Sequence, residues 1–238
     1  MSTSGAVPGF LPSSNGFQFT NSFPPAPAVQ LDLGPAGKVG LGDVSGGVCG
    51  GMVFAVRDYF EASIAVPSLS QTPAPGTPLF EYIVERLLDS WDVPNGVLRY
   101  AQWMALPSEH VRLPLISEPG TFELTVSKSW PAVRADIDAG RLSPLGLVTV
   151  HGTDLKQLGR NHQVLAYGYT LDDSGTLTLS VYDPNTDLSA ADGVTIQLAV
   201  NDAATVTTIS HNINIAEPTL HGFFRADYSA KQPPPGTV

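Results

Sequence analysis

The hydrophobic pattern of the chain changes near residue 140, and this change constrains the fold more than any other feature. Before it, apolar residues recur at three- and four-residue intervals, the spacing of one face of a helix. From Leu145 onwards, short apolar runs alternate with turn sequences, which is typical of strands joined by hairpins. We therefore expect an α+β fold, with a helical layer packed on a C-terminal antiparallel sheet.

Helices and strands are predicted from this periodicity. One helix begins at the single cysteine. Three more are expected over residues 78–91, over 97–106, and from Ser127 or Ser129 to Ala139. Thr77 is a suitable N-cap for the first of these three, with Pro78 at the first helical position. The proline-interrupted stretch 107–121 is predicted to be a connection. Strands are predicted over residues 145–150, 162–171, 177–182, 194–200, 206–210 and 223–228.

Both ends of the chain differ in composition from its middle. Residues 1–30 are rich in Pro, Ser and Phe, and their phenylalanines indicate an arm laid against the body. Residues 31–230 are expected to form a single domain, and the proline-rich stretch 231–238 a disordered tail.

The stretch from Gly46 to Tyr59 is the first candidate for chemistry. It reads GGVCGGMVFAVRDY and holds the only cysteine of the chain, Cys49, at the expected start of a helix. The positive end of a helix dipole and unpaired backbone N–H groups favour a thiolate, which is the nucleophilic form of cysteine. The alternative is that Cys49 is a small buried apolar side chain.

His162 and Asp183 are the candidate partners of Cys49. His162 begins one predicted strand, in NHQVLAYGY, and Asp183 ends the next, in VYDPN. If the two strands form a hairpin across the turn at 172–175, these residues lie at the same rim of the sheet. His162 would then be the base and Asp183 the group that orients it. Asp183 is equally compatible with a turn-forming role before Pro184.

The other histidines are weaker candidates. His151 follows a predicted strand beside that of His162 and is the chief rival base, although a solvated loop histidine is the simpler interpretation. We assign no role to the remaining three, His110, His211 and His221. Since no two His or Cys residues show ligand spacing, neither a metal nor another cofactor is expected.

The three segments GGVCGGM, NHQVLAYGY and VYDPN, in this order, resemble the papain-like cysteine peptidase superfamily. The resemblance is greatest to the branch that includes the bacteriocin-processing, double-glycine leader peptidases, and it spans about residues 42–185. It implies a papain-like fold and a triad of Cys49 as nucleophile, His162 as general base and Asp183 as orienting group. The helices between these motifs do not match any specific member.

The resemblance also implies an oxyanion hole. The backbone N–H of Cys49 would be one donor. The second donor in this family is usually a glutamine side chain six residues before the cysteine, where this chain has Asp43. An ionised carboxylate cannot donate a hydrogen bond, so Asp43 is a departure from the family pattern. Gln163 is the alternative donor.

Composition and charge exclude several classes of partner. The formal net charge is −10, which argues against binding to nucleic acid or to anionic membranes. The N-terminal sequence has no basic region followed by a long apolar run, so no secretory signal is expected, and no apolar stretch reaches the length of a membrane span. The cytoplasm is the default location, and the oligomeric state is left open.

Three functions are compatible with these residues. The first is a cysteine hydrolase acting on a peptide or protein through a thioester intermediate. The second is an acyl transferase or deamidase that uses the same triad. The third is a catalytically impaired member that serves as a binding or structural module, for which Asp43 is the main argument.

Overall fold

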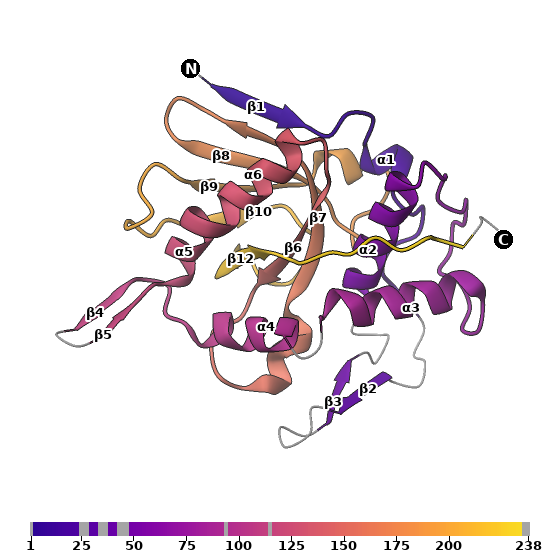
Figure 1. Ribbon diagram of the computed structural model, residues 1–238, viewed down its shortest axis with the longest axis horizontal. Coiled ribbons are helices and arrows are strands. Elements are labelled where there is room, and N and C mark those ends of the chain that lie inside the picture. Colours follow the sequence, from indigo (N-terminus) through magenta and orange to yellow (C-terminus); the bar gives the residue numbers. More distant parts are fainter. Residues whose placement is uncertain are drawn as a thin grey trace.

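The computed structural model describes residues 2–23, 29–32, 38–41, 48–92, 95–113 and 116–234. These residues form a mixed α/β fold, in which an antiparallel sheet curls into a half-barrel with helices beside it (Figure 1). The expected combination of helices with an antiparallel sheet is therefore confirmed.

Eight of the described strands make up the main sheet. In order across the sheet they are β11 (Thr219–Leu220), β10 (Ile209–His211), β9 (Thr195–Ala199), β8 (Thr176–Tyr182), β7 (His162–Leu171), β6 (Ser143–Val148) and β12 (Gly222–Arg225). The eighth, β1 (Thr3–Ala6), pairs with the second half of β7. The strand predicted at 206–210 begins three residues later, at Ile209: a turn lies at residues 203–204, and residues 206–208 are not paired in the sheet.

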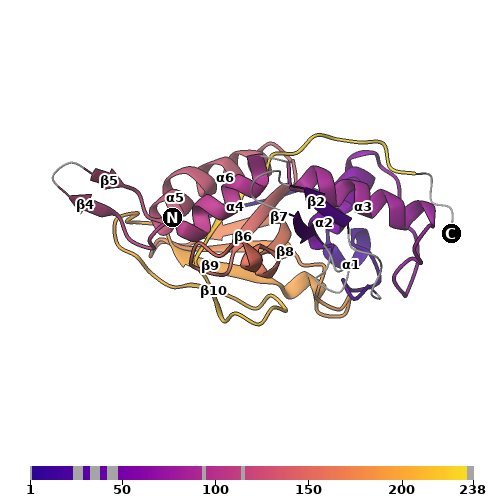
Figure 2. The same cartoon turned by 90° about the horizontal axis from the view of Figure 1, so that it is seen from below.

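The α-helices of the described chain lie in three places: beyond one end of the sheet, beside β6, and across the sheet. Beyond one end of the sheet lie α1 (Pro12–Asn15), α2 (Cys49–Glu61) and α3 (Pro78–Ser90), while α4 (Asn95–Ala105) lies beside β6 (Figure 1). A continuous helical run crosses the sheet, made of α5 (Thr121–Leu124), a π-helical turn (Thr125–Ser129) and α6 (Trp130–Asp138). Figure 2 shows α5 and α6 on one side of β8, β9 and β10. Two short 3-10 helices occupy Leu155–Arg160 and Ala191–Gly193. No helix among the described residues is long and apolar enough to cross a membrane.

The run across the sheet starts earlier than predicted. The helix was expected to start at Ser127 or Ser129. Instead the helix begins at Thr121, and the N–H of Trp130 bonds to the carbonyl of Thr125 five residues back. This widened π turn lets the helix continue through Pro131, which cannot donate a backbone hydrogen bond.

Two small hairpins lie where no strand was predicted. One is formed by β2 (Val29–Asp32) and β3 (Lys38–Leu41), and the other by β4 (Val111–Leu113) and β5 (Ile116–Glu118). Both lie away from the main sheet in Figure 1, and the β4–β5 hairpin projects from the body. Their strands have only three or four residues, which is too short for an alternating apolar pattern to indicate them.

Two apolar clusters stabilise the fold. The first joins α2, α3 and α4 to the N-terminal arm and one side of the sheet, with fully buried Met52 and Ile83 at its centre. The second lies between α6 and the other part of the sheet and includes Val133, Leu147 and Leu179. The cysteine helix is thus held between the first cluster and β7, which fixes its position relative to the strand that carries His162.

The helices α2 and α3 are in close contact at Gly51. A Cβ atom placed on Gly51 would lie 2.1 Å from the carbonyl oxygen of Ile83, which is backbone and cannot move aside easily. The two glycines after Cys49 therefore allow the close approach of α2 and α3.

Replacing Gly51 with alanine is expected to lower the free energy of unfolding by about 1–3 kcal/mol, because the added methyl group pushes α3 away from α2. Gly159→Ala is the matched control, since a Cβ there meets nothing within 4 Å. We expect its effect to stay within about 0.5 kcal/mol. Urea unfolding followed by circular dichroism measures both, and equal stability of the two variants would contradict the packing described here.

The N-terminal arm is built into the body. Its β1 strand is hydrogen-bonded to β7, and Phe17, Phe19 and Phe23 are all buried in the first apolar cluster. The described residues of the arm up to Phe23 thus lie against the body.

The start of the predicted tail is packed, which differs from the expectation of disorder. From β12 the chain runs across α2 and α3 (Figure 1), and Tyr59 Oη donates to the carbonyl of Pro234. The backbone N–H of Lys231 donates to the carboxylate of Asp58. We name residues 226–234 the C-terminal strap. Its proline content suggested a free tail, but proline also suits an extended segment held by side chains of the body.

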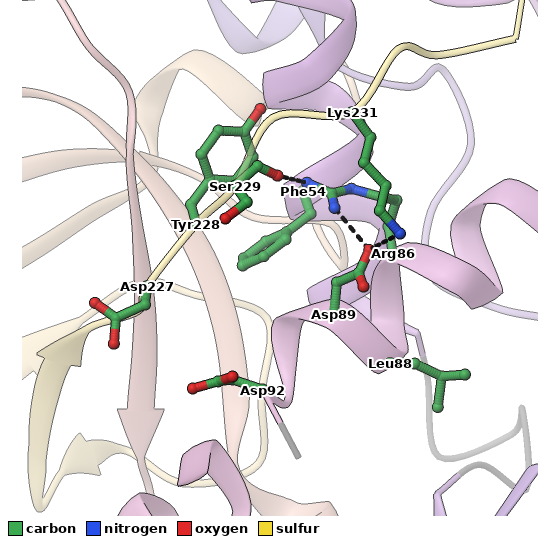
Figure 3. A pocket seen from close by; sticks show the side chains of 9 residues that line it. All are labelled: Phe54, Arg86, Leu88, Asp89, Asp92, Asp227, Tyr228, Ser229 and Lys231. Carbon is green, nitrogen blue, oxygen red and sulfur yellow. Dashed lines mark hydrogen bonds and ion pairs between the residues drawn. The ribbon is translucent and has the colours of Figure 1, made fainter. Parts of the chain in front are cut away.

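A buried ion pair anchors the C-terminal strap. Asp58 and Arg86 have side chains that are 0% and 1% exposed, and their closest charged atoms are 2.6 Å apart. Arg86 also donates to the carbonyl of Ser229 in the strap, and Tyr228 Oη donates to Asp58. Figure 3 shows Arg86 between the strap and α3, with Asp89 and Lys231 beside it.

Candidate functional site

Cys49 is the first residue of α2, and its side chain is partly exposed. Burial alone would raise the pKa of its thiol. The charge and hydrogen bond of His162 and the backbone N–H groups of Gln163 and Gly50 act in the opposite direction, and the net pKa lies below its ordinary value. The helix start thus supplies a free N–H at the sulfur, and the thiolate form is favoured.

His162 is the first residue of β7 and is 4% exposed. Its Nε2 atom lies 2.7 Å from Oδ1 of Asp183, so the other ring nitrogen, Nδ1, is left to meet the sulfur. Burial alone would lower the pKa of His162, but the neighbouring Cys49 sulfur and the Asp183 carboxylate raise it to about 10. An imidazolium between two anionic groups is the result at neutral pH.

Asp183 follows β8 and is fully buried. Burial would raise the pKa of this carboxyl, but hydrogen bonds led by that of His162 hold it below its usual range. Both oxygens are saturated: Oδ1 accepts from His162 and the backbone N–H of Asn185, and Oδ2 accepts from the hydroxyl of Thr186 and the backbone N–H of Asn214. Four donors make Asp183 a rigid anionic anchor for the imidazole.

The β7–β8 hairpin brings His162 and Asp183 together. The strands pair antiparallel from Leu171 opposite Leu177 down to Leu165 opposite Tyr182, with one irregularity between Ala166 and Gly168. The start of β7 and the end of β8 therefore meet at one rim, as the hairpin argument expected.

The two candidate oxyanion donors other than Cys49 are placed differently. Gln163 is 3% exposed, and its side-chain nitrogen donates to the hydroxyl of Ser90 at the end of α3, 3.2 Å away. Its backbone N–H, rather than its side chain, faces the sulfur. Asp43 lies outside the described residues.

The other histidines lie in separate groupings. His151 is beside His221, with ring nitrogens 3.4 Å apart, and His221 also contacts Ser108 and the carbonyl of Leu106. His110 binds Glu123. His211 accepts from the backbone N–H of Ile213. No group of three or more His, Cys, Asp or Glu in the described part of the chain is arranged to hold a metal ion.

Several residues of the site carry no sequence signal that we recognised. Tyr100 donates from its hydroxyl to the carbonyl of His162, at 3.3 Å, and Asn21 contacts both Val48 and Asn185. Thr186 is the exception, because an Asp followed three residues later by Thr in a DPNT turn is a pattern that local side-chain hydrogen bonds favour.

Four cavities among the described residues lie away from the triad. One, of about 460 Å³, lies between α3 and the C-terminal strap and is lined by Phe54, Asp92 and Asp227 among others (Figure 3). Another, of about 430 Å³, includes His151 and His221.

The arrangement of Cys49, His162 and Asp183 combines a nucleophile, a proton carrier and an orienting anion. Such a set can attack an acyl carbon, form a thioester and return a proton to the leaving group. Comparison with known proteins gives no further guide. Scans of family models, curated proteins and solved structures each returned no match to this chain.

Proposed function

We propose that the chain is a cysteine hydrolase of the papain-like type, acting on a peptide or protein substrate. The observation that carries this proposal is the chain of contacts from the Cys49 sulfur through the His162 ring to the saturated carboxylate of Asp183. A papain-like arrangement is part of the proposal. It is supported by the order of the three residues along the chain and by a cysteine helix packed against the strand that carries the histidine.

The reaction begins with the thiolate of Cys49. Its sulfur attacks the carbonyl carbon of the substrate, and the developing oxyanion faces the N-terminus of α2, where the backbone N–H of Cys49 is available. The carbon–nitrogen bond then breaks, and the leaving amine takes its proton from the His162 imidazolium. The acyl group remains on sulfur as a thioester.

Hydrolysis of the thioester restores the site. Water loses a proton to neutral His162 and attacks the acyl carbon, the carbon–sulfur bond breaks, and the acid product leaves. Asp183 keeps the imidazole in one orientation throughout, with Nε2 bound and Nδ1 towards the sulfur.

The first step can be tested with p-nitrophenyl acetate, an activated ester that needs no substrate recognition. We expect a burst of nitrophenolate equal to the enzyme concentration, and an acetyl group on Cys49 in the mass spectrum of the protein. Protein whose cysteine has been alkylated beforehand is the control and should give no burst. Acetylation of Cys49 no faster than that of free cysteine would contradict the proposal.

The same triad supports an acyl transferase or deamidase, if an amine replaces water or a side-chain amide replaces the peptide. A catalytically impaired binding module is the further alternative, since Asp43 stands where the resembling family has an oxyanion-hole glutamine. A faster reaction of the Asp43→Gln variant with the activated ester would indicate that Asp43 limits the chemistry.

A further inference from the structure

Asn21 of the N-terminal arm connects the cysteine helix to the loop after Asp183. Its Oδ1 accepts from the backbone N–H of Val48, the residue before the nucleophile, at 2.7 Å. Its Nδ2 donates to Oδ1 of Asn185 at 3.0 Å, and its backbone N–H donates to the carbonyl of Pro184 at 2.8 Å. One residue thus holds both ends of the candidate site.

These bonds close a ring around the triad. From the Cys49 sulfur the ring passes through His162 to Asp183, whose Oδ1 also accepts from the backbone N–H of Asn185. From Asn185 it returns through Asn21 to Val48, which is covalently bonded to Cys49. Without Asn21 this path is open, and the nucleophile is tied to its partners through the thiol–imidazole contact, the N–H of Gln163 at the sulfur and the packing of α2 against β7.

This bond acts at the start of the cysteine helix. Val48 is the N-cap, and its side chain makes no capping hydrogen bond to the first turn. Asn21, 27 positions away along the chain, accepts from the backbone N–H of Val48 itself. The bond fixes the peptide that precedes Cys49 and therefore helps to fix the direction of the Cys49 N–H and Sγ.

The arm is well suited to hold Asn21 in place. Phe19 and Phe23, two residues to either side, are both buried in the first apolar cluster, and the two rings are in edge contact. Asn21 is itself partly buried, and the two buried rings beside it in the sequence hold its backbone in place.

We infer that Asn21 is a positioning residue of the site: it sets the geometry of Cys49 relative to His162 and Asp183 from a segment outside both the cysteine helix and the sheet hairpin. This inference rests on the proposed function. On this inference the N-terminal arm positions the nucleophile in addition to packing against the body.

The test is the pH dependence of Cys49 alkylation by iodoacetamide in three full-length variants. Asn21→Ala removes both side-chain links, and we expect it to slow alkylation at pH 6 by about ten- to hundredfold, because a small displacement of reacting groups has an effect of that size. We also expect the apparent pKa of the thiol to move up towards that of free cysteine. Asn185→Ala removes only the bond between Asn21 and Asn185 and leaves Asn21 bonded to Val48 and to the carbonyl of Pro184. It should act in the same direction with a smaller effect, which keeps the test sharp if Asn21→Ala folds poorly.

Asn15→Ala is the matched control. It removes another asparagine of the arm, one whose Oδ1 accepts from the backbone N–H of Leu11 within the same turn. If the role of Asn21 were purely structural, Asn21→Ala and Asn15→Ala would both lower the melting temperature. The alkylation profiles of these two variants would then match that of the wild type.

The outcomes separate the two proposals. If wild-type Cys49 is activated and the Asn21→Ala and Asn185→Ala profiles match the wild type, the role of Asn21 is overturned and the proposed function stands. If wild-type Cys49 reacts like free cysteine at every pH, the proposed function fails and the positioning role fails with it.

Discussion

Replacing Cys49 with alanine is expected to abolish the nitrophenolate burst and to slow acyl transfer by at least about a thousandfold, because the covalent step has no other nucleophile. The fold should survive this change. Cys49 is small and partly exposed, and its removal leaves His162 bonded to Asp183. Burst amplitude and circular dichroism measure the two effects separately.

Cys49→Ser provides a second measurement of the same step. A serine hydroxyl has nearly the same shape but a pKa far above that of a thiol, so the thiolate–imidazolium pair cannot form. We expect activity close to that of the alanine variant. A serine variant with wild-type burst kinetics would contradict the role of an activated thiolate.

The largest expected loss of stability follows Arg86→Met. This change leaves the carboxylate of Asp58 buried without its cation and also removes the bond to the carbonyl of Ser229. Breaking a buried pair from one side typically costs about 3–5 kcal/mol, which is a large part of the stability of a domain. Denaturant unfolding should show this loss directly.

Lys231→Met is the control for that experiment. The Lys231 ammonium pairs with Glu85 and Asp89, but its side chain is 38% exposed, and exposed pairs contribute about 0–1 kcal/mol. If Lys231→Met and Arg86→Met destabilised the protein equally, the strap would be held by its surface charges and not by the buried pair.

The sequence was most informative where a local pattern and a buried face coincide. β7 has the predicted limits, His162 to Leu171, because an apolar strand buried on both faces has a continuous signal between a polar loop and a turn. The helix α3 begins as predicted, since Thr77 accepts from the N–H of Phe80 as an N-cap should. The juxtaposition of His162 and Asp183 followed from the same logic, as one hairpin determines which residues share a rim.

The remaining features depend on contacts between distant segments. Asn21 meets Asn185 across 164 positions, and the Lys231 backbone meets Asp58 across 173, so no periodicity or spacing marks either contact. The hydrogen bonds that hold the C-terminal strap to α2 and α3 likewise have no signal in a sequence whose prolines suggest a free tail. The π turn at Thr125–Ser129 depends on how the helix accommodates Pro131, and a regular helical spacing of apolar residues does not indicate such a turn.

The most direct test of the central claim is the second-order rate constant for alkylation of wild-type Cys49 by iodoacetamide as a function of pH. Since the pKa of the thiol is lowered and that of His162 is raised to about 10, the thiolate–imidazolium pair should persist across the range between them. We predict a rate at pH 6 well above that of free cysteine and nearly constant up to about pH 9, with a further change as His162 loses its proton near pH 10. A rate that is low at pH 6 and rises tenfold per pH unit up to about 8.5, as for an ordinary thiol, would contradict the account.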